Sequence, residues 1–121
     1  MGRQVRELRA PAKLNLHLGI HPGRDERGYH RADSVMVAVS LADVVSIRRT
    51  PGEDPSVIMS VDCSVDLAHN TAYRALHALC QATGHDEGYA IEIEKGVPAQ
   101  SGLGAASSDA AAVLRGLCEL W

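Results

Sequence analysis

One stretch decides the fold: Val97-Pro98-Ala99-Gln100-Ser101-Gly102-Leu103-Gly104-Ala105-Ala106-Ser107-Ser108-Asp109-Ala110-Ala111. Alternating apolar residues over 89–95 precede it and an alanine-rich segment follows it to Trp121, so the pattern predicts a strand, a loop and a helix. Gly102 and Gly104 allow a tight turn, because glycine lacks the Cβ that obstructs the backbone. The first turn of a helix has unpaired N–H groups that carry about half a positive charge. The stretch therefore predicts a loop that binds the phosphates of a nucleotide.

Two common nucleotide-binding motifs are absent from this stretch. It contains neither Gly-x-x-x-x-Gly-Lys-Ser/Thr nor Gly-x-Gly-x-x-Gly, so it is neither the common P-loop nor a dinucleotide site. The alternative is a loop of small residues that only caps an alanine-rich helix, which the composition favours about as often. The rest of the chain has to decide between the two interpretations.

The composition is that of a soluble globular domain. Hydrophobic residues make up 45% and charged residues 22% of the 121 residues, which suits one domain with its own core. The net charge of −3 provides no basic patch for nucleic acid and no polybasic membrane anchor. No signal segment or long apolar run is present, so we expect a cytoplasmic protein that binds a small molecule.

The spacing of cysteine and histidine indicates no metal site. Cys63, Cys80 and Cys118 form no Cys-x-x-Cys pair, so we expect buried, reduced thiols and neither a disulfide framework nor a zinc site. His17 and His21 are four residues apart, but a strand does not bring that spacing together as a helix does.

Short strands separated by polar turns are predicted for the first half of the chain. The alternation is strictest over 13–20, which places four apolar residues on one face and Lys13, Asn15 and His17 on the other. From pattern alone, that polar face is interpreted as solvated. A turn is expected at 41–43, and an antiparallel meander over 35–61. The predicted strands are 5–8, 13–20, 35–39, 44–48, 57–61 and 89–95.

Two helices are predicted, and both have an apolar stripe. The first begins near Asn70 and Thr71, continues to about Thr83 and ends at Gly84. Its stripe contains Ala72, Ala75, Leu76, Leu79 and Cys80. The second begins at Ser107 or Ser108 and is expected to bury Ala110, Val113, Leu114, Leu117 and Trp121. The expected class is therefore α+β, with a mostly antiparallel sheet and helices on one face.

Three separated segments now resemble one family, the GHMP kinases, and within it the 4-diphosphocytidyl-2-C-methyl-D-erythritol kinases. They are 11–16 (Pro-Ala-Lys-Leu-Asn-Leu), 27–30 (Arg-Gly-Tyr-His) and the stretch 97–111, in the family's order and approximate spacing. Residues 41–43 and 70–72 extend the similarity to essentially the whole chain. The resemblance implies the fold of the GHMP kinase N-terminal domain, which is similar to ribosomal protein S5 domain 2.

The resemblance also implies an activity. Such kinases transfer a phosphoryl group from ATP, with Mg²⁺, to a hydroxyl of the methylerythritol unit of a cytidine diphosphate substrate, in the non-mevalonate route to isoprenoids. Lys13 then corresponds to the catalytic lysine beside the reacting hydroxyl, and Asn15 to a substrate-binding residue. Tyr29 is expected to stack on the cytosine and His30 to hydrogen-bond its edge.

By the same resemblance, ATP is bound by the loop and by Lys95 just before it. The loop residues implied are Pro98, Ala99, Gln100, Ser101, Gly102, Leu103, Gly104, Ala105, Ala106, Ser107 and Ser108. Gln100, Ser101, Ala105 and Ala106 depart from the glycine or serine that the family commonly has there.

The chain is also shorter than the family's pattern. The family's catalytic aspartate lies in a Gly-Ala-Asp-Val-Pro type of segment beyond the second helix, and Asp109 is not its counterpart. We therefore expect residues 1–121 to be an N-terminal ATP-binding domain without its C-terminal partner, and to be nearly inactive alone. Two alternatives stay open: a GHMP kinase of another small alcohol, and a non-catalytic module that self-associates or binds a protein through a face left uncovered.

Overall fold

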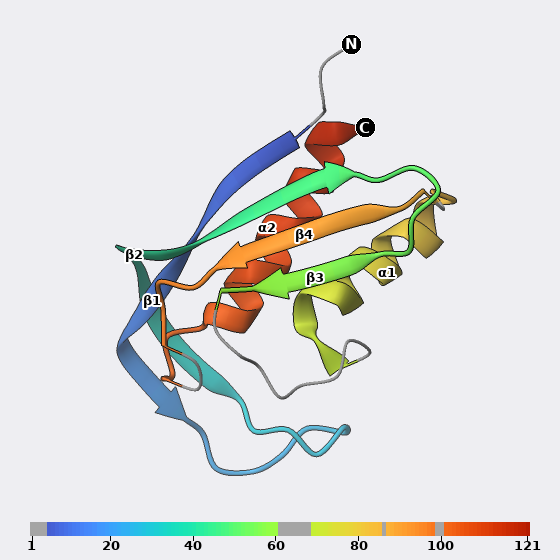
Figure 1. Cartoon of the computed structure of the whole chain (residues 1–121). Helices are drawn as coiled ribbons and strands as arrows, with labels where there is room; N and C mark the ends of the chain where they lie inside the picture. Colours follow the sequence, from blue (N-terminus) through green and yellow to red (C-terminus); the bar gives the residue numbers. More distant parts are fainter. Residues whose placement is uncertain (1–4, 61–68, 86, 99–100) are drawn as a thin grey trace.

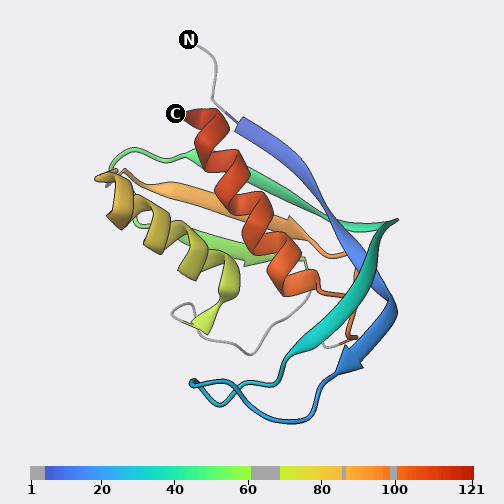
Figure 2. The ribbon, with the colours of Figure 1, turned by 180° about the vertical axis from the view of Figure 1, so that it is seen from behind.

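The computed structural model describes residues 5–60, 69–85, 87–98 and 101–121. In this part of the chain, a four-stranded sheet has the strand order β1-β2-β4-β3. Both helices of the described residues, α1 and α2, lie together on one face of the sheet, and neither lies on the other face (Figures 1 and 2). The predicted α+β class is confirmed. No helix among the described residues is long and apolar enough to cross a membrane.

The first helix, α1, covers Thr71–Thr83, as predicted from its two ends. The side chain of Asn70 accepts hydrogen bonds from the N–H groups of Ala72 and Tyr73, which are two of the unpaired donors at a helix start. Gly84 ends the helix with a φ of 77°, a left-handed conformation that glycine adopts without strain. Ala72 and Leu76 are buried, and Ala75, Leu79 and Cys80 pack against the same core.

The second helix, α2, covers Ala105–Leu120 and begins before the predicted start at Ser107 or Ser108. Gly104 caps it in a left-handed conformation, so the helix starts as soon as the turn is complete. The expected burial of Leu114 is wrong, because the face toward the sheet is rotated relative to the prediction and leaves Leu114 39% exposed. Cys118 is also exposed rather than buried. The buried residues are Ala105, Asp109, Ala112, Val113, Gly116, Leu117 and Leu120.

The first two strands are longer than predicted. Residues 5–8 and 13–20 belong to one strand, β1 (Val5–Ile20), and residues 35–39 and 44–48 belong to another, β2 (Ala32–Arg49). The predicted turn at 41–43 is wrong, because the backbone there stays in the ladder, with Asp43 opposite Ala10 and Ala42 opposite Pro11. Two irregularities in the register, between Pro11 and Lys13 and between Asn15 and His17, interrupt the pairing.

The far half of this strand pair, residues 13–41, is here called the distal hairpin. It extends beyond the helices, as the blue and teal strands of Figure 2 show, and its loop connects Ile20 to Ala32. The side chains expected to form an apolar face are therefore exposed, and so is most of the run 35–39 that resembled a buried strand. The exposed apolar residues are Leu14, Leu16, Leu18, Ile20, Val35, Met36, Val37 and Leu41.

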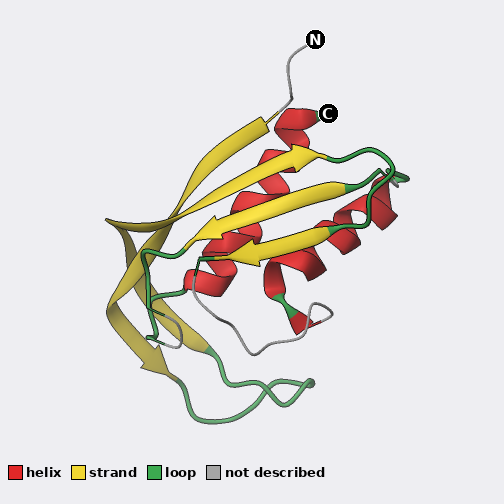
Figure 3. Ribbon diagram, in the orientation of Figure 1, coloured by secondary structure: helices red, strands yellow, loops and turns green. Residues whose placement is uncertain are grey.

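The expected meander is wrong for the strand β3 (Ser56–Met59). It pairs in parallel with β4 (Tyr89–Glu94), and the arrows of the two strands point the same way in Figure 3. In the chain, α1 lies between them and is the crossover. Parallel neighbours need a crossover of this kind, and a helix supplies it. β4 in turn pairs antiparallel with β2. β4 therefore lies between β2 and β3, and the first residue of α2, Ala105, packs with Ala12 of β1.

Candidate functional site

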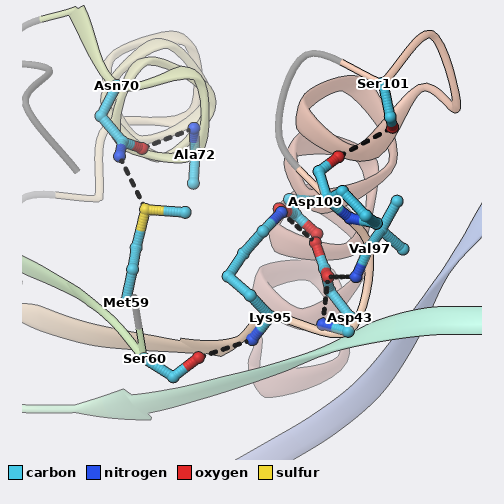
Figure 4. Close-up of polar contacts among 11 residues, drawn as sticks. Asp43, Met59, Ser60, Asn70, Ala72, Lys95, Val97, Ser101 and Asp109 are labelled. Carbon is cyan, nitrogen blue, oxygen red and sulfur yellow. Dashed lines mark hydrogen bonds and ion pairs between the residues drawn. The ribbon is translucent and has the colours of Figure 1, made fainter. Parts of the chain in front are cut away.

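The stretch that connects β4 to α2, residues 96–104, is here called the glycine loop. It is held to the sheet by a small apolar cluster of Ala12, Val97 and Ala105, with Val39 and Leu103 beside it. Within the loop, the Ser101 hydroxyl donates to the Pro98 carbonyl at 2.8 Å (Figure 4). Ala99 and Gln100 lie outside the described residues. The loop is therefore fixed at both its ends, next to strand β1.

The end of the glycine loop has the geometry of an anion-binding helix start. Gly102 and Gly104 have φ values of 76° and 73°, which favour glycine. No side chain among the described residues caps α2 at Gly104, so in this part of the chain the N–H groups of its first turn are left for a ligand or solvent. Ala106 and Ser107 are exposed there, while the N–H of Ser108 donates to the Gly104 carbonyl. This end can accept phosphate oxygens.

Lys13 lies directly against this loop. Its N–H donates to the Leu103 carbonyl at 2.9 Å. A Cβ on Gly104 would lie 3.1 Å from the Lys13 Cγ and 3.2 Å from its Cε, so the lysine side chain runs along the glycine. The fold thus brings the predicted catalytic lysine, about ninety positions earlier in the sequence, to the predicted phosphate-binding loop.

Asn15 lies two residues further along β1, on the distal hairpin. Its Oδ1 accepts a hydrogen bond of 3.1 Å from the Ser34 hydroxyl, and the same hydroxyl also donates to the His17 carbonyl. Asn15 is exposed, so its amide nitrogen is available to a ligand on that side of the strand.

Tyr29 and His30 lie in the loop at the end of the distal hairpin. Asp25 orders this loop, because its Oδ1 accepts the N–H groups of Arg27 and Tyr29 at 2.9 and 3.0 Å. The N–H of Tyr29, then the Arg27 side chain, holds the pKa of Asp25 below its usual value. The Arg27 guanidinium lies 5.5 Å from the centre of the Tyr29 ring, and Tyr29 is 66% exposed. His30 bonds the Gly23 carbonyl through Nδ1 at 2.7 Å.

Lys95 is almost buried, at the end of β4, between two carboxylates. Its Nζ donates to Asp43 at 2.6 Å and to Asp109 at 3.5 Å, and Figure 4 shows the three side chains together behind the loop. Asp43 also accepts the N–H groups of Gly96 and Val97 through Oδ1, at 2.8 and 2.9 Å. The lysine therefore faces the protein interior and closes an ion-pair cluster.

The three groups of this cluster shift one another's pKa. Burial, then a hydrogen bond with the Asp43 carboxyl, raises the pKa of Asp109 from 3.8 to about 7. Burial also acts to raise the pKa of Asp43, but hydrogen bonds from Asp109, Lys95 and the two loop amides outweigh it and lower that pKa. For Lys95, burial is outweighed by the two carboxylates, so its pKa lies above the usual value.

The cluster contains two residues that the sequence analysis did not include in the site. Asp43 was assigned to a turn, and Asp109 was considered only in order to exclude it as a base. One signal could have found them. An aspartate on the buried face of a helix, such as Asp109, requires a cation nearby, and Lys95 is the lysine next to the loop.

Other features of the described part of the chain provide no competing site. No group of three His, Cys, Asp or Glu side chains there could hold a metal ion. A cavity of about 350 Å³ lies at the C-terminal half of α1, lined among others by Leu76, Cys80, His85 and Tyr89. Its lining includes none of the residues that the sequence analysis assigned to the catalytic, ATP-binding or substrate-binding site.

Comparisons with known proteins confirm the resemblance. Residues 70–121 match the model of the GHMP kinases N terminal domain. The 4-diphosphocytidyl-2-C-methyl-D-erythritol kinase of Geobacillus thermodenitrificans is 43% identical over 115 residues, 94% of this chain and 39% of that kinase. The kinase of the same name from Symbiobacterium thermophilum is 43% identical over 95% of this chain and 40% of its own length. The chain thus spans about two fifths of these relatives.

Solved structures agree with these relatives. A crystal structure of 4-(cytidine 5'-diphospho)-2C-methyl-D-erythritol kinase superposes with a TM-score of 0.77 at 35% identity, over 96% of this chain and 41% of that one. The homoserine kinase from Cytophaga hutchinsonii superposes with a TM-score of 0.70 at 20% identity, over 96% of this chain and 35% of that one. The second similarity supports the fold alone.

Proposed function

Since this chain is similar along nearly its whole length to two fifths of these kinases, we propose that it is the ATP-binding part of a small-molecule kinase. The proposed reaction is transfer of the terminal phosphoryl group of ATP to a hydroxyl of 4-diphosphocytidyl-2-C-methyl-D-erythritol, in the cytoplasm. The observation that carries the proposal is the contact between Lys13 and Gly104, because it unites a cation with an anion-binding helix start.

The groups at the loop fit the needs of phosphoryl transfer, which depends on positioning and on charge stabilisation. The N–H groups at the start of α2 and the hydroxyls of Ser107 and Ser108 are the proposed contacts of the ATP phosphates. The Lys13 ammonium is the proposed partner of the reacting hydroxyl and of the charge on the transferred group.

The residues also fit a magnesium ion that arrives with the nucleotide. The described residues include no carboxylate cluster that holds a metal by itself, and the nearest carboxylate pair is already bonded to Lys95. Mg²⁺ commonly takes its oxygens from phosphates and water and only one or two from protein. Ser107 and Ser108 are the proposed protein ligands, and the ion's chemistry is to neutralise phosphate charge.

The proposed binding site for the cytidine part of the substrate is the loop at the tip of the distal hairpin. The exposed Tyr29 ring offers one face to a flat base while Arg27 lies on the ring, and His30 is held by Gly23. These residues are the proposed cytosine contacts, and Asn15 on the same hairpin is the proposed contact of the sugar-alcohol unit.

Calorimetry on the purified chain tests this proposal. Titration of MgATP and, separately, of cytidine 5'-diphosphate is expected to show binding of both, while mevalonate and homoserine do not bind. Lys13→Met is expected to weaken MgATP binding about tenfold, the scale of one lost charge-assisted contact. Arg6→Met is the matched control, because it removes a positive charge from an exposed position of the same strand. A folded chain that binds neither nucleotide contradicts the proposal.

A further inference from the structure

The loop at the tip of the distal hairpin, residues 21–31, is held together by its own hydrogen bonds, although all of its residues are exposed. At its base, the N–H of His21 donates to the Arg31 carbonyl at 2.7 Å, and the His21 ring bonds the Asp33 carboxylate through Nε2 at 2.6 Å. An exposed loop gains little from apolar packing, so its order depends on polar contacts. The residues that these contacts position are therefore candidates for a function of the loop.

Asp25 is the centre of these contacts. Its Oδ1 accepts the N–H groups of Arg27 and Tyr29, and its Oδ2 accepts from the Arg27 guanidinium at 3.1 Å. Its backbone N–H donates to the Tyr29 carbonyl at 2.8 Å, and its carbonyl accepts the N–H of Gly28 at 3.0 Å. The pKa of Asp25 lies below its usual value, so at neutral pH the side chain is ionised and only accepts. One carboxylate thus fixes the backbone on both sides of Gly28.

Arg27 connects this carboxylate to the ring of Tyr29. Its guanidinium pairs with Asp25 and lies over the Tyr29 ring, 5.5 Å from the ring centre, where a cation and an aromatic face attract each other. The ion pair restricts the guanidinium to fewer positions than an unpaired arginine has. One face of the ring is therefore occupied by Arg27, while Tyr29 as a whole stays 66% exposed and keeps surface for a base.

We propose that Asp25 and Arg27 are positioning residues that hold the Tyr29 ring in place for the base of a cytidine nucleotide. A base that binds to a mobile tyrosine costs the freedom that the loop and the side chain lose, whereas a ring held before binding loses little. Asp25 fixes the backbone of Tyr29, and Arg27 restricts the ring from one face. In this role neither residue touches the base. The inference rests on the proposed function, because Tyr29 is the proposed cytosine contact.

The sign of one effect separates this role from a purely electrostatic one. Cytidine 5'-diphosphate is an anion, so if charge alone mattered, loss of the Asp25 carboxylate would strengthen its binding and loss of the Arg27 guanidinium would weaken it. If both residues position the ring, both losses weaken binding. Two side chains of opposite charge are therefore expected to act in the same direction.

The test is calorimetric titration of cytidine 5'-diphosphate into the purified chain and its variants, each checked for folding by circular dichroism. Asp25→Ala is expected to weaken binding roughly tenfold and Arg27→Met roughly threefold, the scale of ordering one or two groups. Asp25→Asn keeps an oxygen for the two amides but loses the charge, so its affinity is expected to lie between those of Asp25→Ala and the wild type. Glu26→Gln, which changes an exposed carboxylate of the same loop, is the control and keeps the wild-type affinity.

Two further measurements make the test specific to the ring. In a Tyr29→Ala background, Arg27→Met is expected to weaken binding no further, because the ring that Arg27 restricts is gone. Without nucleotide, ¹⁵N relaxation is expected to show an ordered Tyr29 amide in the wild type, with an order parameter of about 0.85, and a mobile one in Asp25→Ala, below about 0.6. The reason is that the carboxylate accepts this N–H.

The outcomes separate the inference from the proposed function. If cytidine 5'-diphosphate binds the wild type but binds Asp25→Ala as tightly or more tightly, the inference is wrong and the proposed function stands. A mobile Tyr29 amide in the ligand-free wild type also overturns the inference, because the ring is then not held in advance. If Arg27→Met costs as much without the Tyr29 ring, Arg27 acts on the ligand directly and its positioning role is wrong. A folded chain that binds MgATP but no cytidine 5'-diphosphate contradicts the inference together with the proposed substrate.

Discussion

Gly104 shows how the absence of one side chain shapes the site. Its left-handed conformation ends the glycine loop, and its bare Cα leaves room for the methylene groups of Lys13. Gly102 has nearly the same φ, but a Cβ there would meet nothing within 4 Å. A side chain at either glycine would strain the backbone, but only a side chain at Gly104 would also crowd Lys13.

This difference predicts an asymmetric response to alanine. Gly102→Ala and Gly104→Ala are each expected to cost about 1 kcal/mol of unfolding free energy through backbone strain alone. Gly104→Ala is expected to cost about 0.5–1 kcal/mol more, because its Cβ crowds Lys13. Urea unfolding measures both variants, and the excess should vanish in a Lys13→Ala background. If the two alanine variants lose equal unfolding free energy in both the wild-type and the Lys13→Ala backgrounds, the contact between Lys13 and Gly104 is contradicted.

The residues of the site were predictable to different degrees. Lys13 and the glycine loop came from motifs that are local in the sequence, and the structure places them in contact. The roles assigned to Asn15, Tyr29 and His30 stay predictions. The cluster was missed because Lys95 is 52 positions from Asp43 and 14 from Asp109, and only the folded sheet brings such carboxylates to one ammonium.

Among the elements, predictability follows how local the determining contacts are. α1 was predicted at both ends because Asn70 and Gly84 act within one turn of the helix. β2 was divided wrongly, since whether the chain turns at 41–43 depends on pairing with β1, about thirty residues away. The parallel pairing of β3 with β4 was also missed, because it depends on the crossover of α1.

The packing of α2 on the sheet depends on a small residue in the middle of the interface. At Gly116 an added Cβ would lie 2.5 Å from the Ile47 Cδ1 and 3.1 Å from the Leu8 Cδ1. Gly116→Val is therefore expected to lower the unfolding free energy by about 1–3 kcal/mol through overpacking. Ala111→Val, on the exposed face of the same helix, is expected to cost only about 0.5 kcal/mol through helix propensity. Chemical denaturation followed by circular dichroism compares the two, and equal losses contradict the packing described.

On the scale of the whole molecule, the apolar residues divide between a buried core and an exposed hairpin. Leu117 is fully buried between α2 and the sheet, whereas Leu16 on the distal hairpin is 68% exposed. The sequence could not predict this division, because the alternation over 13–20 is the same whether or not a helix covers the strand. Whether a side chain of β1 is covered depends on how far along this strand α2 extends, and only the three-dimensional fold determines that extent.

The division predicts that two leucines will respond differently to the same truncation. Leu117→Ala is expected to cost about 2–4 kcal/mol of unfolding free energy, because it removes buried methyl groups and leaves a cavity. Leu16→Ala removes surface that is already in water, so its cost is expected to be below about 0.5 kcal/mol. Urea denaturation at low and at high protein concentration measures both. A large loss at Leu16 that grows with concentration would mean that a second copy covers the hairpin, and would favour the alternative of a self-associating module that the sequence analysis left open. A large loss independent of concentration would contradict the exposed position of the hairpin.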